Sequence, residues 1–381
     1  MRILVAPDKF KGSLSAGEAA RAIAAGFRRV FPRARIDCMP VADGGEGTAE
    51  TLTSALDGRM MSKRVCGPDG VEVEANFGLS AQAGIAVVEL AQASGLALLA
   101  AGRNDPMTAT TFGTGQLIAE ALDAGARRII VAIGGSATTD AGTGALSALG
   151  ARFLDDSGRP LPPGGGSLRA LADIDVTRLE ERLHGIAIEV ASDVTNPLCG
   201  PRGAAAVYGP QKDASPHQVQ LLDDALRRFA DVAARKTGAD VRDVPGAGAA
   251  GGMGAGFLSL AHATLRPGAQ LVLEVLDFDR HLEGVTLVVT GEGRLDRQTF
   301  CGKAPHAVAQ AASAAGIPVV ALAGSVDCPP TELAQHGIGT AISLVPGPLS
   351  LEEATAQAGQ LLSDAAERLA RALAMRLEDV D

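Results

Sequence analysis

The sequence contains no tryptophan and a single tyrosine, Tyr208, and only 3% of its 381 residues are aromatic. Proteins that bind single-stranded nucleic acid stack bases on aromatic side chains, so this class is a poor candidate. Lysine and arginine number 34 against 44 aspartates and glutamates, which gives a net charge of −10. A surface that follows a phosphate backbone or an anionic membrane needs clustered basic residues, and no such run is present. We therefore expect neither nucleic acid nor a membrane as a partner.

The cysteines give no sign of a disulfide framework or a structural zinc site. There are five, an odd number, and no two are separated by only two residues. That pattern suits a reducing compartment. The apolar run 3–6 is too short for the core of a secretory signal. The uncharged stretches 244–265 and 304–326 are broken by glycine, proline or polar residues, so neither forms an apolar helix of about 20 residues. We expect a cytoplasmic protein without a membrane span.

Short apolar segments alternate with helical patterns at both ends of the chain. The expected strands are 3–6 and 35–41 near the start, and 285–290, 319–323 and 338–344 near the end. Capping boxes at Ser15–Glu18 and Ser350–Glu353 mark helix starts, and the second of these helices is expected to run to about Arg376. Further helices begin at Thr48 and after Lys303. Two parallel strands are too few for an independent sheet, so we expect both ends to share one five-stranded parallel sheet.

The middle of the chain has a different pattern. Residues 62–90 alternate between apolar and polar residues with glycine-rich breaks, which predicts short antiparallel strands. Beyond them, the apolar segments 129–133 and 186–191 predict strands, and the segments 116–124 and 221–236 predict helices.

The expected fold class is therefore α/β, with two α/β domains. Residues 1–59 and 285–381 together form a Rossmann-like or flavodoxin-like parallel sheet with helices on both faces. Residues 60–284 form the second domain, inserted in the middle of the first. In this organisation both chain ends contribute to one sheet, and the two domains are not successive halves of the sequence.

Six loops combine glycine, carboxylate, lysine and hydroxyl side chains. They are 7–13, 43–48, 134–142, 192–198, 245–256 and 290–299. Ligands of open parallel sheets bind beyond the carboxyl ends of strands, where most of these loops lie. Loop 7–13 places two lysines beside a helix N-terminus, which suits a carboxylate or phosphate. Loop 134–142 can form an anion-binding nest of backbone amides.

The other loops carry acids or glycines. Two acids in loop 43–48 could bind a cation, and Asp193 with Asn196 could hold Mg2+ or orient a hydroxyl. Each loop also has a plain structural interpretation, such as a solvated turn or an Asx turn before proline. The segment 245–256 has GxGxxG spacing but lacks an apolar strand before it, so we reject a dinucleotide fingerprint. Residues 211–213 could reach a phosphate or lie in a solvated loop.

Seven segments, taken in order, resemble the bacterial glycerate kinase family. They are APDKFKGSLSA (6–16), ADGGEGT (42–48), GGSATTDAG (134–142), SDVTNPLCG (192–200), GPQK (209–212), PGAGAAGGMGAG (245–256) and TGEGRLDRQTFCGKAP (290–305). Any one segment is a weak signal, but seven in order are specific. The resemblance implies a two-domain α/β enzyme with its active cleft between the domains. It also implies ATP and Mg2+ as cofactors and D-glycerate as the substrate, with 2-phosphoglycerate as the product in many members.

Phosphoryl transfer depends mainly on positioning and on neutralising charge. As catalytic residues we assign Asp193, which orients the attacking hydroxyl, and Lys11, Arg294 and Lys303, which face the substrate carboxylate and the transferring phosphate. The substrate-binding candidates are Asp8, Lys9, Ser13, Asp43, Glu46, Asn196 and Asp296. The candidates for the nucleotide phosphates are Gly134, Gly135, Ser136, Gly248, Gly251 and Gly252. The candidates for Mg2+ are Asp193 and Glu292.

Two other functions stay open at this point. One is a phosphotransferase that acts on another small hydroxy acid, and the other is a non-catalytic two-lobed binder of small molecules. Phosphorylation at carbon 2 and at carbon 3 of glycerate are both open, as are a monomer and a homodimer.

Overall fold

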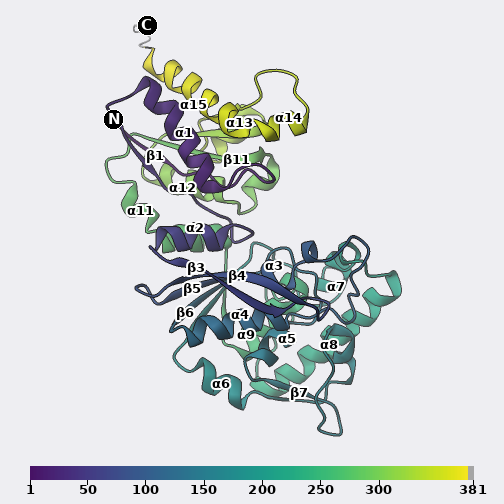
Figure 1. Ribbon diagram of the computed structural model, residues 1–381. Coiled ribbons are helices and arrows are strands. Elements are labelled where there is room, and N and C mark those ends of the chain that lie inside the picture. The colour runs from purple at the N-terminus through teal and green to yellow at the C-terminus, as the bar shows by residue number, and fades with distance from the viewer. Residues whose placement is uncertain (376–381) are drawn as a thin grey trace. The chain divides into compact units, whose positions relative to one another are not determined.

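The computed structural model describes residues 1–375 and divides into two compact units (Figure 1). The terminal unit consists of Met1–Asp43 and the segment that begins at Gly268, and the middle unit is Gly44–Pro267. The sequence placed the boundaries at 59/60 and 284/285. The boundaries in the structure lie earlier in the chain than the predicted ones. Helix α2 (Thr48–Ala55) packs against strands of the middle unit, whereas α10 (Gly268–Val275) packs against a helix of the terminal unit.

The terminal unit has a five-stranded sheet in the order β13-β12-β11-β1-β2, with every neighbouring pair parallel. Its strands are β1 (Arg2–Val5), β2 (Arg35–Cys38), β11 (Leu287–Leu295), β12 (Val319–Val326) and β13 (Thr340–Ser343). In register, Ile3 lies opposite Ile36 on one side and Leu287 on the other. The prediction of one parallel sheet built from both chain ends is thus confirmed.

Helices cover this sheet. They are α1 (Ala16–Val30), α10 (Gly268–Val275), α11 (Phe278–His281), α12 (Ala304–Ala314), α13 (Pro330–Gln335), α14 (Leu351–Ala356), α15 (Ala358–Ala374) and the 3-10 helix η4 (Arg297–Phe300). Helices α1 and α15 lie side by side (Figure 1). Their contact is close because Gly26 has no side chain; a Cβ there would lie 2.2 Å from the Ser363 carbonyl oxygen.

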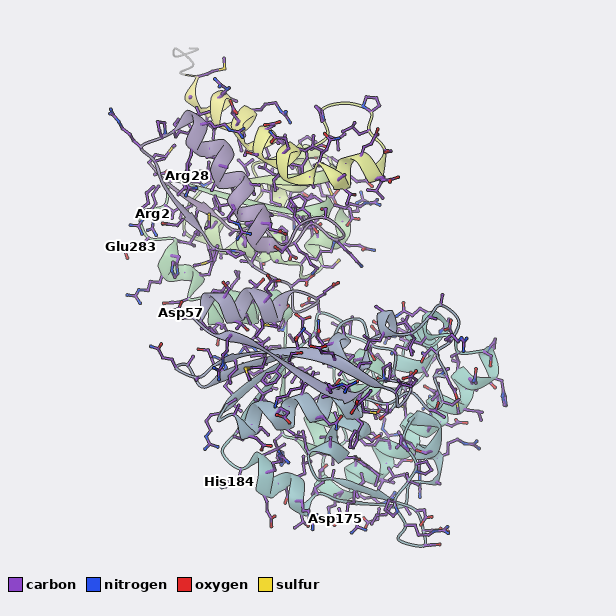
Figure 2. The ribbon with its side chains drawn as sticks, viewed as in Figure 1. Arg2, Arg28, Asp57, Asp175, His184 and Glu283 are labelled. Carbon is purple, nitrogen blue, oxygen red and sulfur yellow. The ribbon has the colours of Figure 1, made fainter. Side chains whose placement is uncertain are left out.

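Both predicted capping boxes, at Ser15 and at Ser350, are present. The expected single C-terminal helix is instead two, because Gln357 leaves the helical conformation at φ −107° and ψ 10°. The predicted end at Arg376 lies outside the described residues. The start of β1 is joined to the far segment after α11, since the Arg2 guanidinium donates to the Glu283 carbonyl oxygen (Figure 2).

The middle unit contains a mixed six-stranded sheet in the order β10-β9-β6-β5-β4-β3. The strands are β3 (Arg59–Cys66), β4 (Glu72–Ser80), β5 (Ile85–Glu89), β6 (Arg128–Ala132), β9 (Ala187–Ala191) and β10 (Thr264–Arg266). The β3–β4 and β4–β5 pairs are antiparallel, as predicted for 62–90, and the remaining pairs are parallel. A separate antiparallel pair, β7 (Arg152–Leu154) and β8 (Asp173–Asp175), was not predicted.

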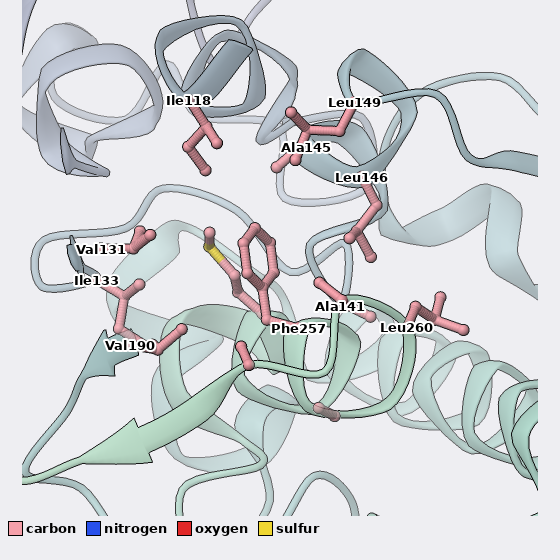
Figure 3. Close-up of a cluster of buried hydrophobic side chains, with 14 of the residues drawn as sticks. Ile118, Val131, Ile133, Ala141, Ala145, Leu146, Leu149, Val190, Phe257 and Leu260 are labelled. Carbon is pink, nitrogen blue, oxygen red and sulfur yellow. The ribbon is translucent and has the colours of Figure 1, made fainter. Parts of the chain in front are cut away.

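The helices of this unit pack on an aliphatic core. They are α2 (Thr48–Ala55), α3 (Ala91–Ser94), α4 (Phe112–Asp123), α5 (Thr143–Ala148), α6 (Thr177–Leu183), α7 (Ala204–Tyr208), α8 (Pro216–Thr237) and α9 (Ala249–Leu260), with the 3-10 helices η1 (Leu96–Leu98), η2 (Gly165–Ala170) and η3 (Pro210–Lys212). Figure 3 shows Phe257 of α9 among Ile118 of α4, Val131 of β6 and Leu146 of α5. Across residues 1–375, no helix combines the length and apolar character that a membrane span requires.

Candidate functional site

The strand order of the terminal sheet reverses between β1 and β11. From β1 the chain goes on to β2 on one side, and from β11 it goes on to β12 on the other. Ligands of open parallel sheets bind at such a reversal, beyond the carboxyl ends of the strands. Two hydrogen bonds join the segments there: the Asp8 amide donates to the Gly291 carbonyl at 2.9 Å, and the Thr290 hydroxyl donates to the Ala6 carbonyl at 2.8 Å.

Asp8 lies at this point, directly beyond β1, and is only 4% exposed. Burial, together with the nearby carboxylates of Asp43 and Glu292, raises the pKa of Asp8 to about 7, while Lys9 acts in the opposite direction. The Lys9 amide donates to Asp8 Oδ1 at 2.6 Å, and the Lys9 ammonium lies 3.8 Å from Asp43 Oδ1. A carboxyl group with a pKa near 7 can exchange a proton at neutral pH, which fits acid–base chemistry.

Glu292 is a second buried carboxylate, 6% exposed, on the half of β11 that extends past the end of β1. Its Oε1 accepts from the Thr299 hydroxyl at 2.5 Å, and its Oε2 accepts from the Lys303 ammonium at 3.2 Å. Burial raises the pKa of Glu292, although these two donors act in the opposite direction. Thr299 is oriented in turn by Asp296, whose backbone amide donates to the Thr299 hydroxyl oxygen at 3.1 Å.

The other predicted residues of the terminal unit flank this cluster. Ser13 closes a tight turn by donating its hydroxyl to the Phe10 carbonyl at 2.9 Å, and Lys11 is exposed on the same turn. Arg294 is also exposed and pairs with Asp296 at 3.2 Å and with Asp327 at 3.0 Å. The structure therefore brings Asp8, Lys9, Asp43, Glu292 and Lys303 together, with Lys11, Ser13, Arg294 and Asp296 on the same loops.

In the middle unit, the loop after β6 leaves its first glycines open. Gly134 and Gly135 are exposed, and a Cβ on Gly134 would meet only Gly45 within 4 Å, at 3.5 Å. Ser136 turns back into the loop, where its hydroxyl oxygen accepts from the Thr138 amide at 3.1 Å. Backbone at Gly134 and Gly135 can thus approach a ligand. Glu46 is exposed on the neighbouring loop before α2.

Two charged side chains behind this loop were missed as site residues. Asp140 is fully buried and accepts from the Thr111 amide at 2.9 Å and the Thr111 hydroxyl at 2.8 Å, as well as from two further amides. Burial raises the pKa of Asp140. Lys212 is only 2% exposed, and its ammonium donates to the Thr138 carbonyl at 2.6 Å. Burial lowers the pKa of Lys212 to about 8, against the opposing effect of Asp140. The solvated-loop interpretation of 211–213 is therefore wrong for Lys212.

The loop after β9 presents Asp193, which is exposed. Asn196 in this loop is engaged locally, because its side-chain amide donates to the Arg202 carbonyl at 2.8 Å and its Oδ1 accepts from the Tyr208 hydroxyl at 2.7 Å. Asn196 thus shapes the loop that presents Asp193.

The glycines before and within α9 are packed against the protein itself. A Cβ would lie 2.2 Å from the Pro197 carbonyl oxygen at Gly248, and 2.1 Å from the Thr138 carbonyl oxygen at Gly251. At Gly252 it would lie 2.7 Å from a Leu198 methyl group. These glycines therefore permit close approach of chain segments to one another.

No group of three or more His, Cys, Asp or Glu side chains among residues 1–375 is arranged to hold a metal ion.

The comparisons with known proteins agree with one another. The model of the glycerate kinase family matches residues 3–374. A glycerate kinase of Bacillus subtilis (strain 168) is 48% identical over 99% of this chain and 98% of its own.

A glycerate 2-kinase of Escherichia coli (strain K12) is 44% identical over 100% of both chains. A crystal structure described as a glycerate kinase 2 from Salmonella typhimurium LT2 matches with a TM-score of 0.90 and 45% identity over 98% of both chains. On these full-length similarities, this chain belongs to the glycerate kinase family.

Proposed function

We propose that this enzyme transfers a phosphoryl group from ATP to the 2-hydroxyl of D-glycerate, with Mg2+. The observation that carries the proposal is the cluster at the reversal of strand order. There the buried carboxylates Asp8 and Glu292 lie near two ammonium groups, that of Lys9, which pairs with Asp43, and that of Lys303, which pairs with Glu292. Phosphoryl transfer needs this combination: cations for an anionic substrate, and carboxylates that orient a hydroxyl or a metal. Membership in a family of kinases sets aside the non-catalytic binder.

In this proposal, cationic side chains of the terminal unit hold the anionic groups. Lys11, Arg294 and Lys303, with the Ser13 hydroxyl, take the glycerate carboxylate and the transferring phosphate. A carboxylate needs charge-assisted hydrogen bonds of this kind to bind tightly. The remaining substrate contacts are assigned to Asp8, Lys9, Asp43, Glu46, Asn196 and Asp296. Asp193 acts as the base that orients the attacking hydroxyl, and its exposed position after β9 leaves it accessible to a substrate.

The backbone amides of Gly134, Gly135 and Ser136 are proposed to bind the nucleotide phosphates. The exposure of the two glycines supports this role, because neither residue has a side chain of its own that would keep a phosphate away from its amide. The same role is proposed for Gly248, Gly251 and Gly252. Gly248 and Gly251 lie closest to the protein's own backbone, and Gly252 lies closest to the Leu198 side chain.

Asp193 and Glu292 are proposed to hold Mg2+. Glu292 fits this ion chemically, since it is a buried oxygen donor with the carboxylates of Asp8 and Asp296 nearby. Mg2+ in kinases is bound by one or two carboxylates plus substrate phosphates, so no preformed cage of side chains is required. When bound, the ion neutralises charge on the phosphate oxygens.

The test is to incubate the protein with Mg2+, ATP and D-glycerate and to record the proton-coupled phosphorus spectrum of the product. A phosphate on carbon 2 couples to one proton and gives a doublet, whereas a phosphate on carbon 3 couples to two protons and gives a triplet. We expect the doublet, and we expect no product with EDTA in excess over Mg2+. A triplet would overturn the assigned carbon, and faster turnover of another hydroxy acid would overturn the assigned substrate.

A further inference from the structure

The loop after β6 is held from behind by two side chains that come from distant parts of the middle unit. The Lys212 ammonium donates to the Thr138 carbonyl at 2.6 Å. The side-chain amide of Asn104 donates to the Ala137 carbonyl at 2.9 Å and also to the Lys212 carbonyl at 2.8 Å. Two consecutive carbonyls of the loop are therefore fixed, and Asn104 ties the η3 backbone to the same place.

This arrangement leaves polar atoms without partners in the protein interior. Asn104 is 8% exposed and Thr139 is 1% exposed, and neither Asn104 Oδ1 nor the Thr139 hydroxyl has a hydrogen-bond partner among residues 1–375.

The ammonium group of Lys212 has three N–H donors. Within the described residues, Thr138 provides the one acceptor for the ammonium of Lys212, and no carboxylate lies within ion-pair distance of it.

A charge buried in this way is expensive, and an apolar side chain of similar volume would pack there with less penalty. A strongly perturbed charged group beside an open loop is a candidate for function. The open end of the loop is Gly134 and Gly135, whose amides are available to a ligand. The ligand class follows from the charge, since a buried cation behind exposed amides attracts an anion.

We propose that Lys212 is a positioning residue for the phosphate chain of a nucleotide. It fixes the loop 134–139 through the Thr138 carbonyl and adds positive potential behind the amides of Gly134 and Gly135. Asn104 supports it by holding the adjoining Ala137 carbonyl. This inference builds on the proposed function, because it takes the nucleotide from there and adds the residue that prepares its site.

The test compares Lys212→Met with Lys63→Met by calorimetric titration of AMP-PNP in the presence of Mg2+. Lys63 is the matched control, because it lies in the same unit, is partly exposed and pairs with Glu120 at 2.6 Å. We expect Lys212→Met to raise the Kd for AMP-PNP at least ten-fold and to leave the KM for D-glycerate within two-fold. Lys63→Met should change neither value by more than two-fold.

A second variant, Asn104→Ala, keeps the test decisive if Lys212→Met does not fold. It should raise the Kd for AMP-PNP about three-fold. A folded Lys212→Met protein with the wild-type Kd would overturn the inference, as would an equal rise in the KM for D-glycerate or an unchanged Kd in Asn104→Ala. If the wild type phosphorylates no hydroxy acid, the proposed function fails, while the Kd comparison still decides the role of Lys212.

Discussion

The ammonium of Lys303 lies 3.2 Å from Oε2 of Glu292, a carboxylate with only 6% exposure. Removing the lysine leaves a buried negative charge whose remaining hydrogen bond within residues 1–375 comes from the Thr299 hydroxyl. We expect Lys303→Met to lower kcat about 100-fold, the size typical for loss of a transition-state electrostatic contact. It should also lower the Tm, because an uncompensated buried charge destabilises the fold. Steady-state kinetics and thermal unfolding measure the two effects.

The double variant Lys303→Met/Glu292→Gln separates these effects. Neutralising Glu292 removes the unpaired charge, so the Tm should return toward the wild-type value while turnover stays low. If kcat recovered together with the Tm, Lys303 would be needed only for stability, and both its proposed contact with the substrate and the proposed binding of Mg2+ by Glu292 would be wrong.

Asp8 should make stability depend on pH. Its pKa is raised to about 7 by burial and by Asp43 and Glu292, whereas an aspartate in an unfolded chain titrates near about 4. Between these values the folded state binds more protons at Asp8 than the unfolded chain does. The contribution of Asp8 to stability is therefore fully present below about pH 4 and is lost as the pH rises through about 7. Asp8→Asn should therefore unfold at a higher Tm than the wild type at pH 8, with the gap shrinking toward pH 5.

The gain at pH 8 corresponds to at most roughly 4 kcal/mol of unfolding free energy. The exposed Asp156 supplies the control, and Asp156→Asn should show no such pH-dependent gap. A constant offset of Asp8→Asn from the wild type at every pH would contradict the assignment. Because Asp8 is proposed to contact the substrate, the more stable variant should also be less active.

The sequence could predict the features that depend on local pattern. The Ser15–Glu18 capping box and the apolar strands of the terminal unit identified helix α1 and the parallel sheet. The strand-end loops predicted Asp8 and Glu292 as site residues, and the structure places both near the reversal of strand order. The start of α8 was placed too late, at 221. The Ser215–Gln218 capping box begins that helix five residues before the first apolar residue on which the prediction relied.

Long-range packing explains what the sequence could not predict. Lys212 is held at its backbone carbonyl by the Asn104 side chain, which is 108 residues away, and at its ammonium by the Thr138 carbonyl of a third segment. Likewise, the sequence shows that segment 245–256 is rich in glycine, but it does not show that the Thr138 carbonyl packs against Gly251. Asp140 belongs to the segment 134–142, one of those that resemble the glycerate kinase family, but its complete burial becomes apparent only in the folded loop.

Asp193 is the residue proposed to orient the attacking hydroxyl. Asp193→Asn keeps the side-chain shape and removes the base, so kcat should fall by about 100-fold or more with little change in the Tm. Asp156→Asn again provides an exposed control in the same unit. Turnover by Asp193→Asn within a few-fold of the wild type would remove this assignment and would favour another carboxylate as the base.

The variant Gly251→Ala tests why a position near the start of α9 requires glycine: because the chain packs closely there, or because the backbone adopts a conformation that favours glycine. It has φ +67°, and an added Cβ would lie 2.1 Å from the Thr138 carbonyl oxygen. Gly70 has φ +86° with nothing within 4 Å of the same position, so Gly70→Ala measures the backbone strain alone. That strain is worth roughly 1–2 kcal/mol. Gly251→Ala should lower the Tm clearly more than Gly70→Ala, because the Thr138 carbonyl must also move.

The Gly251→Ala variant should weaken AMP-PNP binding as well, since Thr138 belongs to the loop that Lys212 holds. Equal Tm losses in the two variants would show that the conformation, and not the contact with Thr138, requires glycine at position 251.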